Sequence, residues 1–303
     1  MTRVSDALAR AAEQRPDLPL KSEGVPVPPT DLPMEAWLSE DGPAAADNMR
    51  EFPVGEALAP AEATVIDGPL LESSRIDEKL MTGGAGQIGS VEQYRRLAAR
   101  LHVLQAERGT RTVMVTSAVV GEGKTLTATN LALTLSESYR RRVLLIDADL
   151  RHPWVHELFK LQNLTGLNDG IRADTERKVP LIRVSEHLSV LTAGRPDPDP
   201  MSVLSSDRMR RVLADAARSF DWVIVDTPPV AVLTDAHLLA TLVDTAILVV
   251  RAGSTQFAEM QQAVEAIGRD RILGVVLNCA DEANRSAYHY YGYDQRTHKA
   301  ATA

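Results

Sequence analysis

The chain has 303 residues, of which 44% are hydrophobic, and this is enough for a sizeable core in one large domain or two small ones. Its net charge of -8 argues against a nucleic-acid-binding protein, and the triplet Arg140-Arg141-Arg142 is better explained as a solvated turn than as a basic patch. The single cysteine, Cys279, excludes an internal disulfide framework and fits a reducing cytosol, and its place after an apolar run favours a buried thiol. No stretch reaches the roughly 20 apolar residues that span a bilayer, and the opening residues lack the apolar block of a signal peptide, so we expect any membrane association to come through a partner.

Residues 1–85 differ in composition from the rest of the chain. They hold ten of the 17 prolines, and only the opening segment is periodic, with Val4, Leu8 and Ala11 on one helical face. We expect a small N-terminal helix and then a Pro-rich, largely disordered region that ends in the glycine-rich joint 81–86. The helix could dock a partner or fray, and the sequence does not decide between these.

From about residue 88 the pattern becomes regular. VEQYRRLAARLHVLQAERG predicts a helix with Leu97, Leu101 and Leu104 on one face and Gly109 past its end. Short apolar runs then alternate with helical stretches, which indicates a parallel, doubly wound α/β sheet whose strands are buried on both faces. The predicted strands are 112–117, 143–148, 188–193, 222–227, 245–251 and 272–278. We expect this domain to cover 86–280 and a polar tail to occupy 281–303.

Residues 118–125, AVVGEGKT, have the spacing of a Walker A phosphate loop, with alanine in place of its first glycine. Gly121 and Gly123 would let backbone N–H groups turn toward phosphate oxygens, and the dipole of the following helix favours the same charge. Lys124 can reach the β- and γ-phosphates, and the Thr125 hydroxyl can bind Mg²⁺. A plain glycine turn is the weaker alternative, because the lysine-threonine pair stands between a strand and a helix. The residues expected to contact the nucleotide are Val120, Gly121, Glu122, Gly123, Lys124, Thr125 and Leu126.

Aspartates stand at the ends of two predicted strands: Asp147 and Asp149 in VLLIDADLR, and Asp226 in VIVDTPP. In open α/β sheets ligands lie beyond the carboxyl ends of the strands, so these side chains are expected near the phosphate loop. Because Mg²⁺ keeps several waters, one or two carboxylates with Thr125 would suffice to bind it. A remaining carboxylate could accept the proton of an incoming hydroxyl. Each aspartate could instead cap the N-terminus of a helix.

Four of the six tyrosines lie in one short segment of the tail, AYHYYGYD. They are Tyr288, Tyr290, Tyr291 and Tyr293. A globular core uses tyrosines singly, with the ring packed and the hydroxyl bonded. A cluster in a glycine-containing polar tail therefore needs another explanation, or else the aromatic rings pack on the edge of the domain.

Taken in order, these motifs resemble those of the bacterial tyrosine autokinases of capsule and exopolysaccharide synthesis, the BY-kinases of the CpsD/CapB type. The resemblance runs from about Glu92 to Tyr293. AVVGEGKT is similar to the family's Walker A motif, LLIDADLRHP to its Walker A′ and VIVDTPP to its Walker B, with Asp235 following in VLTDA. Each motif alone is shared with other P-loop ATPases, but the ordered set that ends in clustered tyrosines is specific.

The resemblance implies a P-loop NTPase fold and an ATP-dependent kinase that phosphorylates its own tyrosine cluster, in trans, to regulate capsule or exopolysaccharide synthesis and export. Lys124 and Thr125 would hold ATP·Mg²⁺, and Asp226 would help to bind the metal. Asp147 and Asp149 would assist metal binding and deprotonate the tyrosine. The implied partners are other copies in a ring or transient dimer, a separate membrane-spanning activator and further tyrosine substrates, which puts the protein in the cytoplasm at the inner membrane.

One family feature is imperfect. Members carry a helix with the spacing E-x-x-R-x-x-R that contacts the next subunit of a ring. Glu92 and Arg95 fit this spacing, but the third position is Ala98, with Arg96 and Arg100 nearby. A ring would therefore be built differently or be absent, and the alternative for Glu92 and Arg95 is an exposed i,i+3 pair worth only tenths of a kcal/mol.

Two other functions stay open. A partition or Min-type ATPase shares the P-loop branch, but its phosphate loop usually carries an early second lysine, where this chain has Val119, Val120 and Gly121. Such a protein also needs a surface for DNA or lipid, and no terminal basic amphipathic helix is evident here. A nucleotide-bound scaffold of the polysaccharide machinery is the third function, and the intact phosphate and metal residues disfavour it.

Overall fold

The structure is a computed structural model that describes residues 63–67, 77, 80, 88–172, 179–230 and 234–280. The predicted N-terminal helix, most of the Pro-rich region and the four tail tyrosines lie outside the described residues. Within the described residues, no helix combines the length and the apolar character needed to cross a bilayer.

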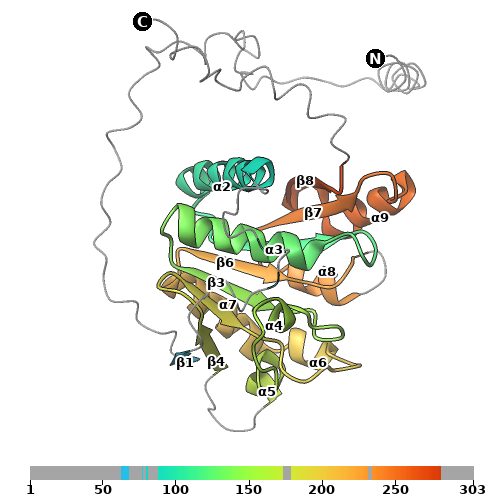
Figure 1. The fold of residues 1–303 in the computed structure, drawn as a ribbon. Coiled ribbons are helices and arrows are strands. Elements are labelled where there is room, and N and C mark those ends of the chain that lie inside the picture. Colours follow the sequence, from blue (N-terminus) through green and yellow to red (C-terminus); the bar gives the residue numbers. More distant parts are fainter. Residues whose placement is uncertain are drawn as a thin grey trace, which may run out of the picture. The chain divides into compact units, whose positions relative to one another are not determined.

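An eight-stranded sheet forms the centre of the described part, with the strand order β1-β4-β5-β3-β6-β2-β7-β8 (Figure 1). Neighbouring strands are parallel except β4 and β5, so the predicted mostly parallel, doubly wound sheet is confirmed. The strands are β1 (Ala63–Asp67), β2 (Thr112–Ser117), β3 (Val143–Asp147), β4 (Val179–Arg183), β5 (Leu188–Leu191), β6 (Trp222–Asp226), β7 (Thr245–Arg251) and β8 (Ile272–Asn278).

Helices cover both faces of this sheet (Figure 1). One face is covered by α3 (Lys124–Leu133), which continues into the π-helical turn η3 (Thr134–Ser138), by the short α4 (Val155–Leu158), and by α2 (Ile88–Arg108), which packs mainly on α3 and η3. The other face is covered by α5 (Leu167–Arg172), α6 (Met201–Leu204), α7 (Asp207–Ser219), α8 (Thr234–Ala240) and α9 (Phe257–Ile267). The short η4 (Arg269–Arg271) leads into β8.

The unbroken apolar runs follow from this three-layer arrangement. In β3, Val143 and Leu145 enter the core under α3, whereas Leu144 and Ile146 enter the core on the opposite face. Successive strand residues point to opposite faces, so a strand that is covered on both sides needs an apolar residue at every position. Every residue of β2, β3 and β6 is buried.

The sequence did not predict two strands at one end of the sheet. β1 is the short run ATVID within the Pro-rich region, and β4 is VPLIR, which contains Pro180. β4 joins β5 through only two antiparallel residue pairs, and β1 joins β4 across more than a hundred residues of sequence. β1 is short and its partner is distant in sequence, and β4 is short and contains a proline, so no local periodicity reveals either strand.

Two smaller expectations have different outcomes. The predicted helix after residue 88 is confirmed as α2, and Gly109 follows it with φ +69°, the left-handed conformation that often ends a helix. The expectation of a buried thiol is wrong, because Cys279 is exposed. Cys279 follows β8, which lies at the edge of the sheet and exposes Val275 and Leu277. An apolar run at a sheet edge is therefore not evidence of burial.

Candidate active site

The predicted phosphate loop connects β2 to α3 at the carboxyl ends of the central strands. β2 lies between β6 and β7, and β3 is the next strand beyond β6. The register pairs Asp147 of β3 directly with Asp226 of β6. The strand order therefore brings the phosphate loop and the strand-end aspartates to one edge of the sheet, as expected for this class of fold.

The loop has the backbone geometry that phosphate binding needs. Gly121 and Gly123 have φ of +86° and +92°, a region that residues with a Cβ rarely adopt. α3 begins at Lys124, and no side chain caps its first N–H groups. These donors are therefore available to phosphate oxygens, and the helix dipole adds to their attraction. Val120 is exposed at the tip of the loop, whereas Leu126 packs against the core.

Lys124 is held by the aspartates and is largely shielded from water. Its Nζ lies 2.7 Å from Asp149 Oδ2, and the side chains of Lys124 and Asp149 are only 14% and 4% exposed. The Nζ also donates to Thr125 Oγ1 at 3.2 Å. Burial acts to lower the pKa of Lys124, but the charges of Asp226, Asp149 and Asp147 outweigh it and raise this pKa. The ammonium is therefore charged and lies where the terminal phosphates of a nucleotide are expected.

Asp226 is a fully buried carboxylate whose two oxygens make no hydrogen bond of standard geometry. Its pKa is raised to about 6, chiefly by burial, against the opposing influence of Lys124 and of the nearby Thr125 hydroxyl. A buried carboxylate is costly without partners, and such groups usually pair or bind metal. Its donor set and the adjacent Thr125 therefore fit a divalent cation.

Asp147 is also fully buried, but its oxygens are occupied. Oδ2 accepts the N–H groups of Trp154 at 3.1 Å and Val155 at 3.0 Å, and Oδ1 accepts that of Asp149 at 3.3 Å. Asp147 thus organises the start of α4, as the capping alternative proposed. Burial and the neighbouring charge of Asp226 raise its pKa well above the usual value. Among the described residues no three acidic, histidine or cysteine side chains form a complete metal cage, so a cation would also need water or phosphate ligands.

The opposite side of the loop is fixed by a β7–β8 network of Glu122, Thr255 and Asn278. Glu122 is buried, and its carboxylate accepts the Val119 N–H at 2.8 Å, the Arg251 N–H at 3.4 Å and the Thr255 hydroxyl. Asn278 Nδ2 donates to the Glu122 carbonyl at 2.8 Å. The Glu122 side chain therefore serves the loop, and only its backbone N–H stays available to a nucleotide.

Sequence reasoning missed Thr255 and Asn278. Asn278 lies so close to Gly123 that a Cβ added there would be 2.1 Å from its Nδ2. The signal that could have found Asn278 is its place at the end of an apolar strand, the same place that singled out the aspartates. Thr255 lies in the loop after β7 and carries no such signal.

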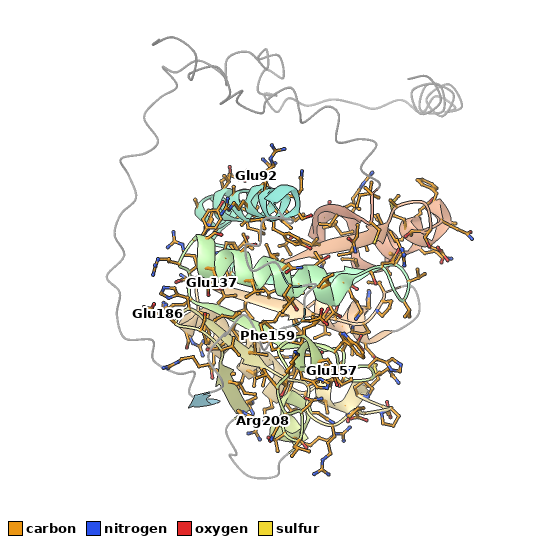
Figure 2. The ribbon with its side chains drawn as sticks, in the orientation of Figure 1. Glu92, Glu137, Glu157, Phe159, Glu186 and Arg208 are labelled. Atoms are coloured by element: carbon orange, nitrogen blue, oxygen red, sulfur yellow. The ribbon has the colours of Figure 1, made fainter. Side chains whose placement is uncertain are left out.

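The two remaining residues of the resemblance, Asp235 and Glu92, have structural partners. Asp235 is buried and forms a two-pronged ion pair with Arg151, whose Nε and Nη2 lie 2.6 and 3.3 Å from its oxygens. Glu92 lies on α2 (Figure 2) and pairs with Arg95 at 3.8 Å, with both side chains about half exposed. Ala98, at the third position of the E-x-x-R-x-x-R spacing, is fully buried in the core.

Comparisons with known proteins identify the class of this domain. The family model described as "CobQ/CobB/MinD/ParA nucleotide binding domain" matches residues 113–301. Tyrosine-protein kinase YwqD of Bacillus subtilis (strain 168) is 37% identical over 204 residues, which cover 66% of this chain and 86% of the relative. Putative tyrosine-protein kinase CapB of Staphylococcus aureus is 31% identical over 208 residues, which cover 67% of this chain and 90% of the relative.

Solved structures give the same picture. The kinase domain of Escherichia coli tyrosine kinase Etk has a TM-score of 0.55 at 31% identity, over 62% of this chain and 74% of that one. The chimerical protein CapA2B2 has a TM-score of 0.59 at 25% identity, over 71% and 93%. Fold and site thus define a P-loop nucleotide-binding protein. Within that class, the chain belongs to the family of bacterial tyrosine-protein kinases, as its ordered motifs implied.

Proposed function

We propose that this chain is an ATP- and Mg²⁺-dependent tyrosine autokinase that acts on the tail tyrosines of a neighbouring copy, in support of capsule or exopolysaccharide synthesis and export. The acceptors would be Tyr288, Tyr290, Tyr291 and Tyr293. The observation that carries the proposal is Asp226, a fully buried carboxylate whose two oxygens make no hydrogen bond of standard geometry, beside a charged Lys124 and an uncapped helix N-terminus. A metal ion would satisfy the carboxylate, and a polyphosphate would satisfy both the ammonium and the helix N-terminus. Few other ligands would satisfy all three groups.

Each side chain has a distinct part in this proposal. The loop amides and Lys124 would grip the phosphates, and Thr125 and Asp226 would hold the cation, which neutralises charge on the transferred phosphoryl group. Asp147 would keep Asp149 and the start of α4 in place while adding to the metal's surroundings. Because a triphosphate competes for Lys124, its arrival would break the 2.7 Å contact with Asp149 and free that carboxylate to accept the tyrosine proton.

The partners and organisation belong to the same proposal. The domains would be an N-terminal region (1–85), whose strand β1 adds to the sheet, a kinase domain (86–280) and a tyrosine tail (281–303). β8 ends at Asn278, which contacts the phosphate loop, so the last described strand ends beside the site. Action in trans needs a dimer or ring, and we expect a separate membrane-spanning activator to bring the cytoplasmic copies together at the inner membrane.

The test is to incubate the purified chain with ATP·Mg²⁺ and map the products by mass spectrometry. We expect phosphotyrosine in the tail segment, and replacement of its four tyrosines by phenylalanine should remove most label while nucleotide binding persists. Tyr94 and Tyr139 are poor acceptors, because the partly buried Tyr94 packs against the core and the Tyr139 hydroxyl donates to the Arg95 carbonyl at 3.0 Å. Label that stays on either residue would refute the tail as acceptor.

The same incubation separates the two other functions. Release of phosphate without phosphotyrosine would favour a Min-type ATPase switch, and neither product would favour a scaffold. To test action in trans, a Lys124→Met chain that carries the tail tyrosines is mixed with an active chain that lacks them. Labelling of the Lys124→Met chain, rising with total protein concentration, is the expected result, whereas no transfer between chains would contradict it.

A further inference from the structure

Trp154 is an exposed tryptophan at the rim of the candidate active site. The residue is 58% exposed, whereas Trp222, the other tryptophan among the described residues, is 0% exposed. The Trp154 N–H donates to Asp147 Oδ2 at 3.1 Å, and α4, which carries Glu157, begins directly after it (Figure 2). Single exposed apolar residues are common on protein surfaces, so the position of this ring beside a catalytic candidate carries the argument, and not its exposure alone.

The backbone that carries the indole is fixed to both strand-end carboxylates. His152 donates its N–H to Asp149 Oδ1 at 3.2 Å, and Val155 donates its N–H to Asp147 Oδ2 at 3.0 Å. Val155 is fully buried in the core under α3. The backbone at Trp154 is therefore set relative to the carboxylates, which is what a docking contact for a reacting group requires.

The segment that carries Trp154 also lies on the side of the loop where we expect an acceptor to arrive. Lys124, which would reach the terminal phosphates, points to Asp149, in the same segment as Trp154. The other side of the loop is occupied by Glu122, Asn278 and Thr255. A hydroxyl that attacks the terminal phosphate would therefore approach past Trp154 rather than past β7 and β8.

We propose that Trp154 binds a second tyrosine ring of the acceptor peptide, two residues from the tyrosine that takes the phosphate. This inference rests on the proposed kinase function and adds its substrate preference. In an extended peptide residues i and i+2 lie on the same side, roughly 7 Å apart. The tail offers two such pairs, Tyr288 with Tyr290 and Tyr291 with Tyr293. With one ring at the carboxylates, its partner meets the rim, where offset or edge-to-face aromatic contact is favourable.

The experiment measures the coupling between the two rings. The full chain, with its four tail tyrosines replaced by alanine, phosphorylates peptides of residues 284–297 in which Tyr290 is the only tyrosine. One peptide carries Tyr288→Phe and the other Tyr288→Ala, with alanine at the remaining tyrosine positions. Each peptide's KM is measured with enzymes that carry Trp154, Trp154→Ala or Trp154→Phe. Leu164→Ala, which removes another exposed apolar side chain, is the matched control.

With Trp154 present we expect the phenylalanine peptide to have a KM about three- to tenfold lower than the alanine peptide, the range for one aromatic pair. Trp154→Ala should remove this difference and leave the KM for ATP unchanged, whereas Trp154→Phe and Leu164→Ala should keep it. An undiminished peptide difference in Trp154→Ala, or an effect on the KM for ATP alone, would overturn the inference.

Failure of the kinase function is distinguishable from failure of this inference. If no enzyme form phosphorylates either peptide, the proposed function fails, and the ring contact is decided by binding. Isothermal titration calorimetry in the presence of ADP·Mg²⁺ then measures the affinity of each peptide for each enzyme form. Tighter binding of the phenylalanine peptide that disappears in Trp154→Ala would uphold the contact, and equal affinities would overturn it.

Discussion

The two sides of the phosphate loop differ in how far their buried carboxylates are satisfied by hydrogen bonds. Toward β3 and β6 the loop meets Lys124, Asp149 and Asp226, where charge is buried and the two oxygens of Asp226 make no hydrogen bond of standard geometry. Toward β7 and β8 it meets the β7–β8 network, where both carboxylate oxygens of Glu122 accept hydrogen bonds. Unsatisfied buried charge marks the place where ligands bind, and satisfied polar groups keep the loop in shape. Substitutions on the two sides should therefore have separate effects on activity and stability.

The largest effect is expected from Lys124→Met, which keeps an apolar stem and removes the charge. Phosphotyrosine formation should fall at least ~100-fold, because the variant loses a hydrogen-bond donor that stabilises charge in the transition state. Stability should fall by about 3 kcal/mol, because Asp149 stays buried without its partner. Tail labelling and urea unfolding measure the two effects. The double variant Lys124→Met/Asp149→Asn should recover stability but not labelling, and labelling near the wild-type rate in the single variant would contradict the role of this side.

Asp226→Asn should separate activity from stability. Loss of the metal-binding carboxylate should again lower phosphotransfer at least ~100-fold. Its folded-state pKa of about 6 lies above the ordinary 3.8, so the unfolded chain loses this proton first as the pH rises. The group therefore lowers stability progressively between these two pH values and by a constant amount above them. Asp226→Asn should remove that dependence and stabilise the nucleotide-free protein at about pH 8 by roughly 1–3 kcal/mol.

The control for this variant is Asp244→Asn, in a carboxylate that accepts two backbone hydrogen bonds. Asp244 Oδ2 accepts the N–H groups of Arg111 and Thr112, both at 2.8 Å. Replacing Asp244 by asparagine should therefore destabilise the protein by about 1 kcal/mol or more. Urea unfolding at pH values below and above the Asp226 transition compares the two variants. If Asp226→Asn destabilised the protein as Asp244→Asn does, Asp226 would have partners and the metal argument would lose its basis.

The β7–β8 network gives a smaller, different effect. Asn278→Ala removes the hydrogen bond to the Glu122 carbonyl, worth about 1 kcal/mol, so the KM for ATP should rise about fivefold while kcat changes little. Steady-state kinetics and nucleotide binding measure this change. Leu277→Ala, on the same strand and 60% exposed, is the matched control and should leave both unchanged. Unaltered nucleotide affinity in Asn278→Ala would show that the loop keeps its shape without β8.

The same comparison explains what the sequence could and could not reveal. Lys124, Asp147 and Asp226 stand in short motifs whose order along the chain already indicates a P-loop site. The contacts of Glu122 with Thr255 and Asn278 join residues 133 and 156 positions apart, and only the strand order brings them together. The central strands were predicted because burial on both faces leaves a local apolar pattern. The end of the sheet formed by β1 and β4 was not predicted. The exposure of Cys279 was not predicted either, because it depends on the place of β8 at the other edge of the sheet.

The smallest effect on stability is expected on α2, the helix that packs mainly on α3 and η3. Glu92 and Arg95 form a half-exposed pair at 3.8 Å, so replacing both with alanine should change the free energy of unfolding by less than about 0.5 kcal/mol. Because fold stability should hardly change, any change in tail labelling can be attributed to a contact between copies. If the double variant unfolds like the wild type but labels its tail more slowly, with the deficit reduced at higher protein concentration, α2 contacts another copy despite the buried Ala98. If labelling is also unchanged, the pair is only an intrahelical contact, and copies must meet through another surface.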